Sequence, residues 1–417
     1  MRTYAAMIIL FFVSMTLSAQ EKLLNRNDVQ NALKHIEKNY DRFLKKQIQI
    51  AEIPAPPFHE AKRARFMTEE FKRLGLKQVH IDSAGNVLGL RKGRKPHMLV
   101  ISAHLDTVFP EGTDVSVQRN GQRYLGPGLV DDSLGLMNLL ALIEALKATG
   151  IQTESSLLFV ATVGEEGLGD LRGVKYLFLK SDYRDRIKAF ISIDGAKPGR
   201  ITNSALGSKR YRVTVTGPGG HSYGAFGLVN PAHALGQIIA RFTSVGVPGD
   251  PKTTYNVGRL GGGTSVNSIP FEVWMEVDMR SESSEELKKL EAFFLQTVAQ
   301  GVRAENLFRV ASDSKLKVRS ERIGDRPSGT IPDSSALVQK AKWAITALGF
   351  TPRTTTSSTD ANIPISLGIP AITTGGGGTS GGAHSLKEWF DPREAHKGIQ
   401  KNLLLVLAAA RIVPSQN

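Results

Sequence analysis

The sequence predicts an α/β fold, in which a mostly parallel sheet is covered by helices on both faces and a smaller α+β domain is inserted into the larger one. Three observations predict it. Short, continuous apolar runs alternate with longer helical patterns. The middle of the chain instead gives the order strand, helix, strand, strand, helix, strand, which fits an open-faced sandwich. The length of 417 residues suits two or three domains.

The strands of the larger domain are expected at three apolar runs, Met98–Ala103, Ser156–Val163 and Ala189–Ile193. Leucine and isoleucine at helical spacing predict helices over Leu134–Ala148 and Ile399–Ile412. Strands that are buried on both faces have continuous apolar runs, so these runs indicate a parallel sheet. In such sheets the functional side chains gather at the carboxyl ends of the strands.

The inserted domain is expected at residues 207–323, between parts of the larger domain at 20–206 and 324–417. Its strands alternate apolar and polar residues, and its helices are amphipathic. In chain order, its elements are expected at Lys209–Val215, Pro231–Thr243, Thr253–Leu260, Phe271–Met279, Ser284–Gln300 and Leu316–Ile323.

Residues 1–19 have the pattern of a secretory signal peptide. Arg2 precedes an apolar stretch from Ala5 to Val13, and small residues follow up to Ala19. If cleavage follows Ala19, Leu17 is the third residue before the cut, where leucine is unfavourable. The exact cleavage site is therefore left open. An uncleaved anchor is the alternative. The pattern predicts an exported protein, periplasmic or secreted, without stable membrane insertion after cleavage.

The composition excludes several classes of function. The chain has no cysteine, which rules out disulfides, thiolate metal sites and cysteine nucleophiles. The net charge of +14 comes from scattered lysine and arginine residues, and no nucleic-acid-binding motif accompanies them. We therefore expect a solvated basic surface and no nucleic-acid partner. Any metal ion must be bound by His, Asp and Glu.

Two groups of polar residues lie next to predicted elements of the larger domain. His104 and Asp106 follow the first strand, and residues two apart in an extended chain point to the same side. Asp106 could therefore orient the His104 ring. Asp131 and Asp132 precede a predicted helix, where an aspartate could cap the helix or bind a cation. Two adjacent buried aspartates need a cation, which makes Asp131 a candidate bridging ligand.

Further acidic and imidazole side chains follow the other strands. Glu165 and Glu166 come after the second strand, Asp194 after the third, and His384 after a later apolar run. Each residue alone could be an ordinary surface or turn residue. Together, nitrogen and oxygen ligands without sulfur suit two Zn²⁺ ions, with Co²⁺ or Mn²⁺ possible.

These residues stand in motifs that resemble the M20 family of co-catalytic zinc peptidases, and most of all its tripeptidase (peptidase T) branch. The resemblance covers nearly the whole chain after the first residues. The motifs are Ser102–Val108 (SAHLDTV), Gly128–Asp132 (GLVDD), Gly164–Gly167 (GEEG), Gly219–Ser222 (GGHS), Asn267–Pro270 (NSIP), Thr359–Asn362 (TDAN) and Gly382–Ser385 (GAHS). It implies a zinc-exopeptidase-like catalytic domain and a ferredoxin-like lid that often forms the dimer interface.

The resemblance also implies a dinuclear metal site. Asp131 would bridge two ions. His104 and Asp194 would complete the ligands of one ion, and Glu166 and His384 those of the other. A cis peptide bond after Asp131 belongs to the same pattern.

Five further residues receive roles from the resemblance. Glu165 would be the general base that activates the metal-bound water, and Asp106 would hold His104. His221 would come from the lid to polarise the scissile carbonyl, and in dimers of the family the partner subunit can supply this residue. Asn267 and Arg280 resemble lid residues that bind the backbone or free carboxylate of the substrate, although ordinary polar positions on the lid sheet are an equal alternative.

The resemblance indicates an exopeptidase for short peptides with a free amino terminus, because Asp194 stands where carboxypeptidases and deacylases of the family have glutamate. Many relatives have lysine two residues after the bridging aspartate, whereas this chain has Ser133 at that position. N-acyl-amino-acid deacylation or carboxypeptidase G2-like hydrolysis is the main alternative. A peptide-binding relic without activity is another. A serine hydrolase built on Gly378–Gly382 is disfavoured, because a loop continues there to His384.

Overall fold

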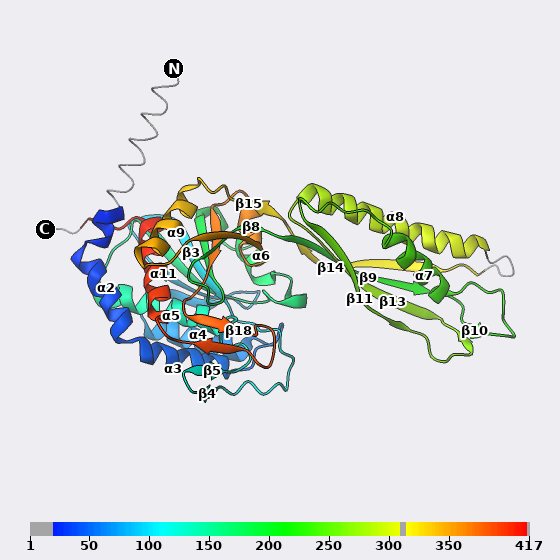
Figure 1. Cartoon of the computed structure of the whole chain (residues 1–417), viewed down its shortest axis with the longest axis horizontal. Coiled ribbons are helices and arrows are strands. Elements are labelled where there is room, and N and C mark those ends of the chain that lie inside the picture. The colour runs from blue at the N-terminus through cyan, green and yellow to red at the C-terminus, as the bar shows by residue number, and fades with distance from the viewer. Residues whose placement is uncertain (1–19, 309–313, 415–417) are drawn as a thin grey trace, which may run out of the picture. The chain divides into compact units, whose positions relative to one another are not determined.

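The computed structural model describes residues 20–308 and 314–414 (Figure 1). They form two compact units, one of which is Ser204–Gly329 and the other the described residues on either side of it. The second unit extends slightly beyond the expected 207–323, because its outer strand β14 (Lys317–Arg326) pairs with β9 (Gly207–Thr216) along nearly its whole length. The expected signal peptide lies outside the described residues.

The first unit is built on a large mixed sheet with the order β1-β2-β6-β3-β7-β17-β8-β15. The four central strands β6, β3, β7 and β17 are parallel, and the flanking pairs β1–β2, β2–β6 and β17–β8 are antiparallel. The strands are β1 (Lys77–Ile81), β2 (Val87–Arg91), β3 (Lys95–His104), β6 (Ser155–Thr162), β7 (Ile187–Ile193), β8 (Arg200–Ala205), β15 (Gly329–Thr330), β16 (Arg353–Ser357), which pairs with β8, and β17 (Ala371–Thr374).

Helices flank this sheet, and every residue of β6 is buried, so both faces are covered. The predicted α/β class is confirmed. Helix α5 is apolar on almost all sides, as a helix inside a core must be. The helices are α2 (Asn27–Lys38), α3 (Tyr40–Ala51), α4 (Ala61–Arg73), α5 (Ser133–Thr149), α6 (Arg172–Leu179), α9 (Ala336–Ala347), α10 (Asn362–Ser366) and α11 (Ala395–Ala410).

A small antiparallel sheet of the first unit joins segments that are far apart in the sequence. Its order is β18-β19-β5-β4, with β4 (Gln118–Asn120), β5 (Arg123–Leu125), β18 (Thr379–Gly381) and β19 (Trp389–Asp391). The chain runs from β5 into the loop that carries Asp131, and β18 and β19 flank the loop that carries His384. Sequence analysis did not predict this sheet.

The second unit has the predicted order of elements. Strand β9 is followed by α7 (Pro231–Phe242), β11 (Thr253–Gly262), β13 (Glu272–Ser281), α8 (Ser284–Phe308) and β14. The antiparallel sheet has the order β11-β13-β9-β14, and α7 and α8 pack against it over a core of its own. This is the ferredoxin-like arrangement. A two-stranded pair, β10 (Gly220–His221) with β12 (Ser268–Ile269), extends from it.

Over the residues that the structure describes, no helix combines the length and the apolar character that a membrane crossing requires.

Candidate metal centre

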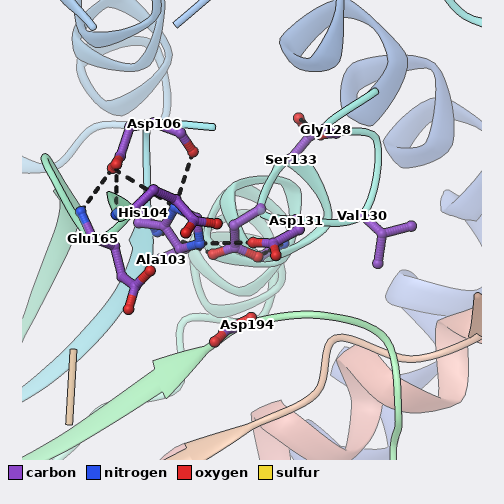
Figure 2. Close-up of polar contacts among 12 residues, drawn as sticks. Ala103, His104, Asp106, Gly128, Val130, Asp131, Ser133, Glu165 and Asp194 are labelled. Atoms are coloured by element: carbon purple, nitrogen blue, oxygen red, sulfur yellow. Dashed lines mark hydrogen bonds and ion pairs between the residues drawn. The ribbon is translucent and has the colours of Figure 1, made fainter. Parts of the chain in front are cut away.

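The carboxyl ends of three parallel strands place the first site residues at one edge of the large sheet. β3 ends at His104, which pairs with Thr162 of β6, and Glu165 follows β6 closely. Asp194 comes directly after β7, and its main-chain N–H donates to Thr374 at the end of β17. Figure 2 shows His104, Glu165 and Asp194 grouped at these strand ends.

The loop before helix α5 brings the two adjacent aspartates to the same place. The peptide bond between Asp131 and Asp132 is cis. Asp132 is the N-cap of α5: one carboxylate oxygen accepts from Gly135 N at 3.1 Å, and the other accepts from His104 N at 3.0 Å. Ser133 Oγ donates to the Gly128 carbonyl at 2.6 Å and closes the loop. Asp132 therefore fixes the loop to β3, and Asp131 faces the other side chains.

Asp131 lies between the two histidines. Its Oδ1 is 2.9 Å from His104 Nε2, and its Oδ2 is 3.0 Å from His384 Nε2. His384 Nε2 is also 3.0 Å from Glu166 Oε1. Two groups that could each hold an ion share this aspartate, His104 with Asp131 and Asp194, and Asp131 with Glu166 and His384; each group has its donor atoms within 4.8 Å.

The charges of the centre fit two divalent cations. Burial raises the pKa of Asp194, and the nearby Asp131 and Glu166 carboxylates raise it further. Hydrogen bonds to Asp131 and Glu166 raise the pKa of His384 to about 11. The pKa of Asp131 is lowered despite its burial, because both histidines hydrogen-bond to it. A cluster that attracts protons so strongly is a cluster that positive ions would stabilise, and its nitrogen and oxygen donors suit zinc.

Asp106 holds the His104 ring chiefly through its main chain. The main-chain carbonyl of Asp106 accepts from His104 Nδ1 at 3.0 Å, whereas the carboxylate is 3.7 Å from that nitrogen. The carboxylate instead accepts from the main-chain N–H of Glu165 at 3.0 Å (Figure 2). It also accepts from the main-chain N–H of Glu166 at 2.8 Å. With Nδ1 donating to this carbonyl, His104 keeps Nε2 directed at Asp131, and Nε2 is the nitrogen that would bind an ion once it gives up its proton.

Glu388 is a site residue that sequence analysis missed. It is buried, and its carboxylate accepts from the N–H groups of Gly128 and Val130 at 2.8 Å and of Asp131 at 3.1 Å. Burial raises the pKa of Glu388 to about 7, and the nearby Asp131 charge contributes. Glu388 thus positions the loop of Asp131 from a segment near His384. Its only sequence signal is its place four residues after His384.

Arg63 is a second unexpected residue, a fully buried cation that contacts the chain next to Asp106. It donates to the main-chain carbonyls of Leu105, Ile53 and Ala51. Burial lowers the pKa of Arg63 to about 10, although the charges of Asp106 and Asp132 oppose this. Arg63 therefore holds the chain directly before Asp106 and offsets part of the acidic charge.

The second unit carries the other three predicted residues and brings two of them together. His221 pairs with Ser268 across β10 and β12, and Ser222 N donates to the Asn267 carbonyl at 2.9 Å. The His221 ring is exposed, and its Nδ1 accepts from the N–H groups of Tyr223 and Gly224 at 3.3 and 3.2 Å. Nδ1 is an acceptor here, so the neutral ring carries its proton on Nε2 and can donate it.

Arg280 lies elsewhere on the second unit. Its Nε donates to Asp278 Oδ2 at 2.7 Å. In the register of β13 with β9, Arg280 pairs with Ser208, whereas Glu272 at the start of β13 pairs with Thr216 near the His221 loop. Eight residues of extended strand span about 27 Å. Arg280 and the His221 loop therefore lie at opposite ends of this sheet.

One family model matches the chain, and similar proteins are found both by sequence and by structure. The profile of the peptidase family M20/M25/M40 matches residues 100–408. The uncharacterised protein YqjE of Bacillus subtilis (strain 168) is 27% identical over 361 residues, which cover 80% of this chain and 90% of that protein. Carboxypeptidase G2 of Pseudomonas sp. (strain RS-16) is 24% identical over 54% of this chain and 56% of its own length. The crystal structure of a tripeptidase from Staphylococcus aureus superposes with a TM-score of 0.74, at 24% identity, over 89% of this chain and 99% of the tripeptidase.

Proposed function

The chain belongs to the peptidase family M20/M25/M40 and is a hydrolase that acts on peptides; from this premise we propose that it is an exported, zinc-dependent exopeptidase for short peptides with a free amino terminus. The observation that carries the proposal is the position of Asp131, which two overlapping groups of donor atoms share. One group contains Asp194, the residue that favours free-amine substrates within the family.

We assign the cluster to two Zn²⁺ ions, with Co²⁺ or Mn²⁺ as alternatives. His104 and Asp194 would hold one ion, Glu166 and His384 the other, and Asp131 both. When bound, such a pair of ions acidifies a water molecule and stabilises negative charge on a carbonyl oxygen.

Glu165 has the position of a general base in this proposal. Its side chain is buried, and its carboxylate forms a donor group with His104 and Glu166. Its main chain is fixed by Asp106. Glu165 would accept a proton from the attacking water and return it to the leaving amine, which typically accounts for about 10²–10⁴-fold of the rate.

His221 would donate a hydrogen bond from Nε2 to the carbonyl oxygen of the scissile bond, and Arg280 and Asn267 would bind the backbone or free carboxylate of the substrate. A short peptide cannot reach both His221 and Arg280 of one chain, because about 27 Å of sheet separates them. This supports a homodimer in which His221 comes from a second copy. Mixing inactive Glu165→Gln and His221→Ala chains tests this: shared sites would restore activity, whereas unshared sites would leave the mixture inactive.

N-acyl-amino-acid deacylation and carboxypeptidase G2-like hydrolysis form the second candidate, which the similarity to carboxypeptidase G2 favours. The deciding experiment pairs zinc-loaded protein with di- and tripeptides and with their N-acetylated forms. We expect kcat/KM to be larger for the free-amine series. Preference for the blocked series would transfer the assignment to the deacylases, and no turnover of either series would leave only a binding function.

Export is proposed from residues 1–19 alone. N-terminal sequencing of the protein recovered outside the cytoplasm should give a start close to Gln20. A chain that is retained in the cytoplasm with its first residues intact would contradict this part of the proposal.

A further inference from the structure

A cavity of about 860 Å³ lies within the first unit and opens beside His384. Three segments form it: the chain that follows Asp106, the end of β5 with the start of the Asp131 loop, and the residues after His384. The lining residues are Val108, Phe109, Pro110, Thr113, Asp114, Ser116, Gln118, Leu125, Gly126, Pro127, His384, Ser385 and Leu386. The volume is that of a small-molecule site, with room for a long side chain together with part of a peptide backbone.

The walls of the cavity are largely apolar. Val108, Phe109 and Pro110 come from one segment, and Leu125 and Pro127 from another. Leu386, only two residues from His384, has 68% of its surface exposed. An exposed leucine contributes little to folding, but beside a metal centre it offers apolar surface to a bound molecule.

One acidic group faces this apolar surface. Among the described residues that line the cavity, Asp114 is the only carboxylate. Its Oδ1 accepts from Ser116 N at 2.9 Å, which fixes the side chain on its loop. Thr113, Ser116 and Gln118 add neutral polar groups. The cavity therefore combines an apolar wall with one carboxylate.

We propose that this cavity, which opens beside His384, binds one of the two substrate side chains that flank the scissile bond. We propose further that it selects lysine or arginine at that position. The inference rests on the proposed peptidase function and names the substrate class of the same site. A lysine or arginine side chain has an apolar stem, which fits the leucine, valine and phenylalanine wall, and a cationic end, which Asp114 attracts. A glutamate of similar length would bring two negative charges together.

The test compares free-amine peptides that differ at one position, tried on each side of the scissile bond. The three side chains are those of lysine, of norleucine as the uncharged stem, and of glutamate. On one side of the bond we expect kcat/KM to be about fivefold larger for lysine than for norleucine, as for an exposed ion pair, and lower again for glutamate. Asp114→Asn should bring the ratio of lysine to norleucine close to one, and Asp114→Lys should make glutamate the better substrate.

Two further variants separate charge from surface. Asp185→Lys makes the same change of charge on the exposed helix η2 (Arg184–Arg186), at the opposite end of β7 from the centre, and should leave the substrate ratios unchanged. Leu386→Ala should lower kcat/KM for lysine and norleucine peptides alike, relative to an alanine peptide, by roughly tenfold.

Binding of the same peptides to zinc-loaded Glu165→Gln protein, measured by calorimetry, gives a readout that does not depend on turnover. A preference for lysine that Asp114→Asn abolishes supports the inference. Equal binding of the three peptides, or a preference that both Asp114 variants retain, overturns it. If wild-type protein cleaves peptides without such a preference, the cavity inference fails and the proposed function stands; if it cleaves none, the proposed function fails and the binding series still decides the role of the cavity.

Discussion

The metal centre of the first unit and the His221 loop of the second unit hold their residues in opposite ways. His104 is 2% exposed, and its ring is in contact with Asp106 on one side and Asp131 on the other. His221 is exposed, and two main-chain N–H groups of its own loop hold its ring. The contacts of His104 therefore fix its ring in the absence of substrate, whereas the exposed ring of His221 is accessible to a substrate.

The difference shows where each unit would tolerate change. Around the metal centre, Asp106, Asp132 and Glu388 each use carboxylate oxygens to hold the main chain of ligand-bearing loops. Such supporting contacts usually affect metal affinity about 10–100-fold. At His221, a substitution removes a hydrogen-bond donor and leaves the fold of the unit in place. Five predictions test this contrast.

The largest effect is expected for Asp131→Ala, which removes the carboxylate that both donor groups share. We expect loss of both metal ions and activity at the background level, with the fold retained in circular dichroism. Metal analysis of dialysed protein is the measurement, with exposed Asp185→Ala as control. A variant that retains two bound zinc ions would show that the ligands were misassigned.

Glu165→Gln should retain both ions and lose about 10²–10⁴-fold in kcat, because the amide cannot accept the proton. Metal content and kcat measured on the same sample separate this result from that of Asp131→Ala. Near-normal turnover would remove Glu165 from the role of base.

His221→Ala should lower kcat by about 10²–10³-fold, the usual effect of losing one donor to a developing oxyanion. Metal content and thermal stability should remain those of the wild type, because the ring is exposed. If the variant instead loses metal, the contrast between the two regions is wrong.

Glu388→Gln should weaken metal binding by about 10–100-fold. Glutamine has one acceptor oxygen where the carboxylate serves three N–H groups of the Asp131 loop. Competition with a chelator measures the affinity, and Glu394→Gln on the surface is the matched control. Unchanged affinity would mean that the loop holds its shape without Glu388.

The smallest effect concerns Asp278 in the second unit. Burial tends to raise its pKa, but hydrogen bonds from Arg280 and Arg210 outweigh this and lower it. A lowered pKa contributes stability above the unfolded value near 3.9, and this is lost as the pH falls through the folded value. The contribution at neutral pH should be below about 1 kcal/mol. Urea unfolding followed by tryptophan fluorescence should show an acid-dependent loss of stability that is smaller in Asp278→Asn than in wild type by this amount, and equal losses would remove Asp278 from the account.

Sequence reasoning predicted the elements better than the supporting contacts. The strand ends that carry His104, Glu165 and Asp194 follow from apolar runs, because a buried strand leaves a local pattern. The sequence allowed Asp132 either to cap the helix or to bind a cation, because both roles require an acidic residue directly before a helix. The structure shows that it caps α5 and also accepts from His104 N.

Glu388 and Arg63 could not be found in this way. Glu388 accepts hydrogen bonds from main-chain N–H groups more than 250 positions away in the sequence. Arg63 donates to main-chain carbonyls, which no residue type marks in a sequence. Asp106 was expected to orient the His104 ring, and its main-chain carbonyl does so at 3.0 Å, whereas its carboxylate is 3.7 Å from the same nitrogen. Main-chain partners of this kind become visible only when the loops are placed in space.

The insertion of Ser204–Gly329 into the first unit has a consequence for biosynthesis. At translation rates of about 5–20 residues per second, His384 leaves the ribosome roughly ten seconds or more after Asp194. Until then the nascent chain lacks both His384 and Glu388, and neither the second donor group nor the support of the Asp131 loop exists. A chain released before residue 384 therefore lacks the second donor group and the carboxylate that holds the Asp131 loop.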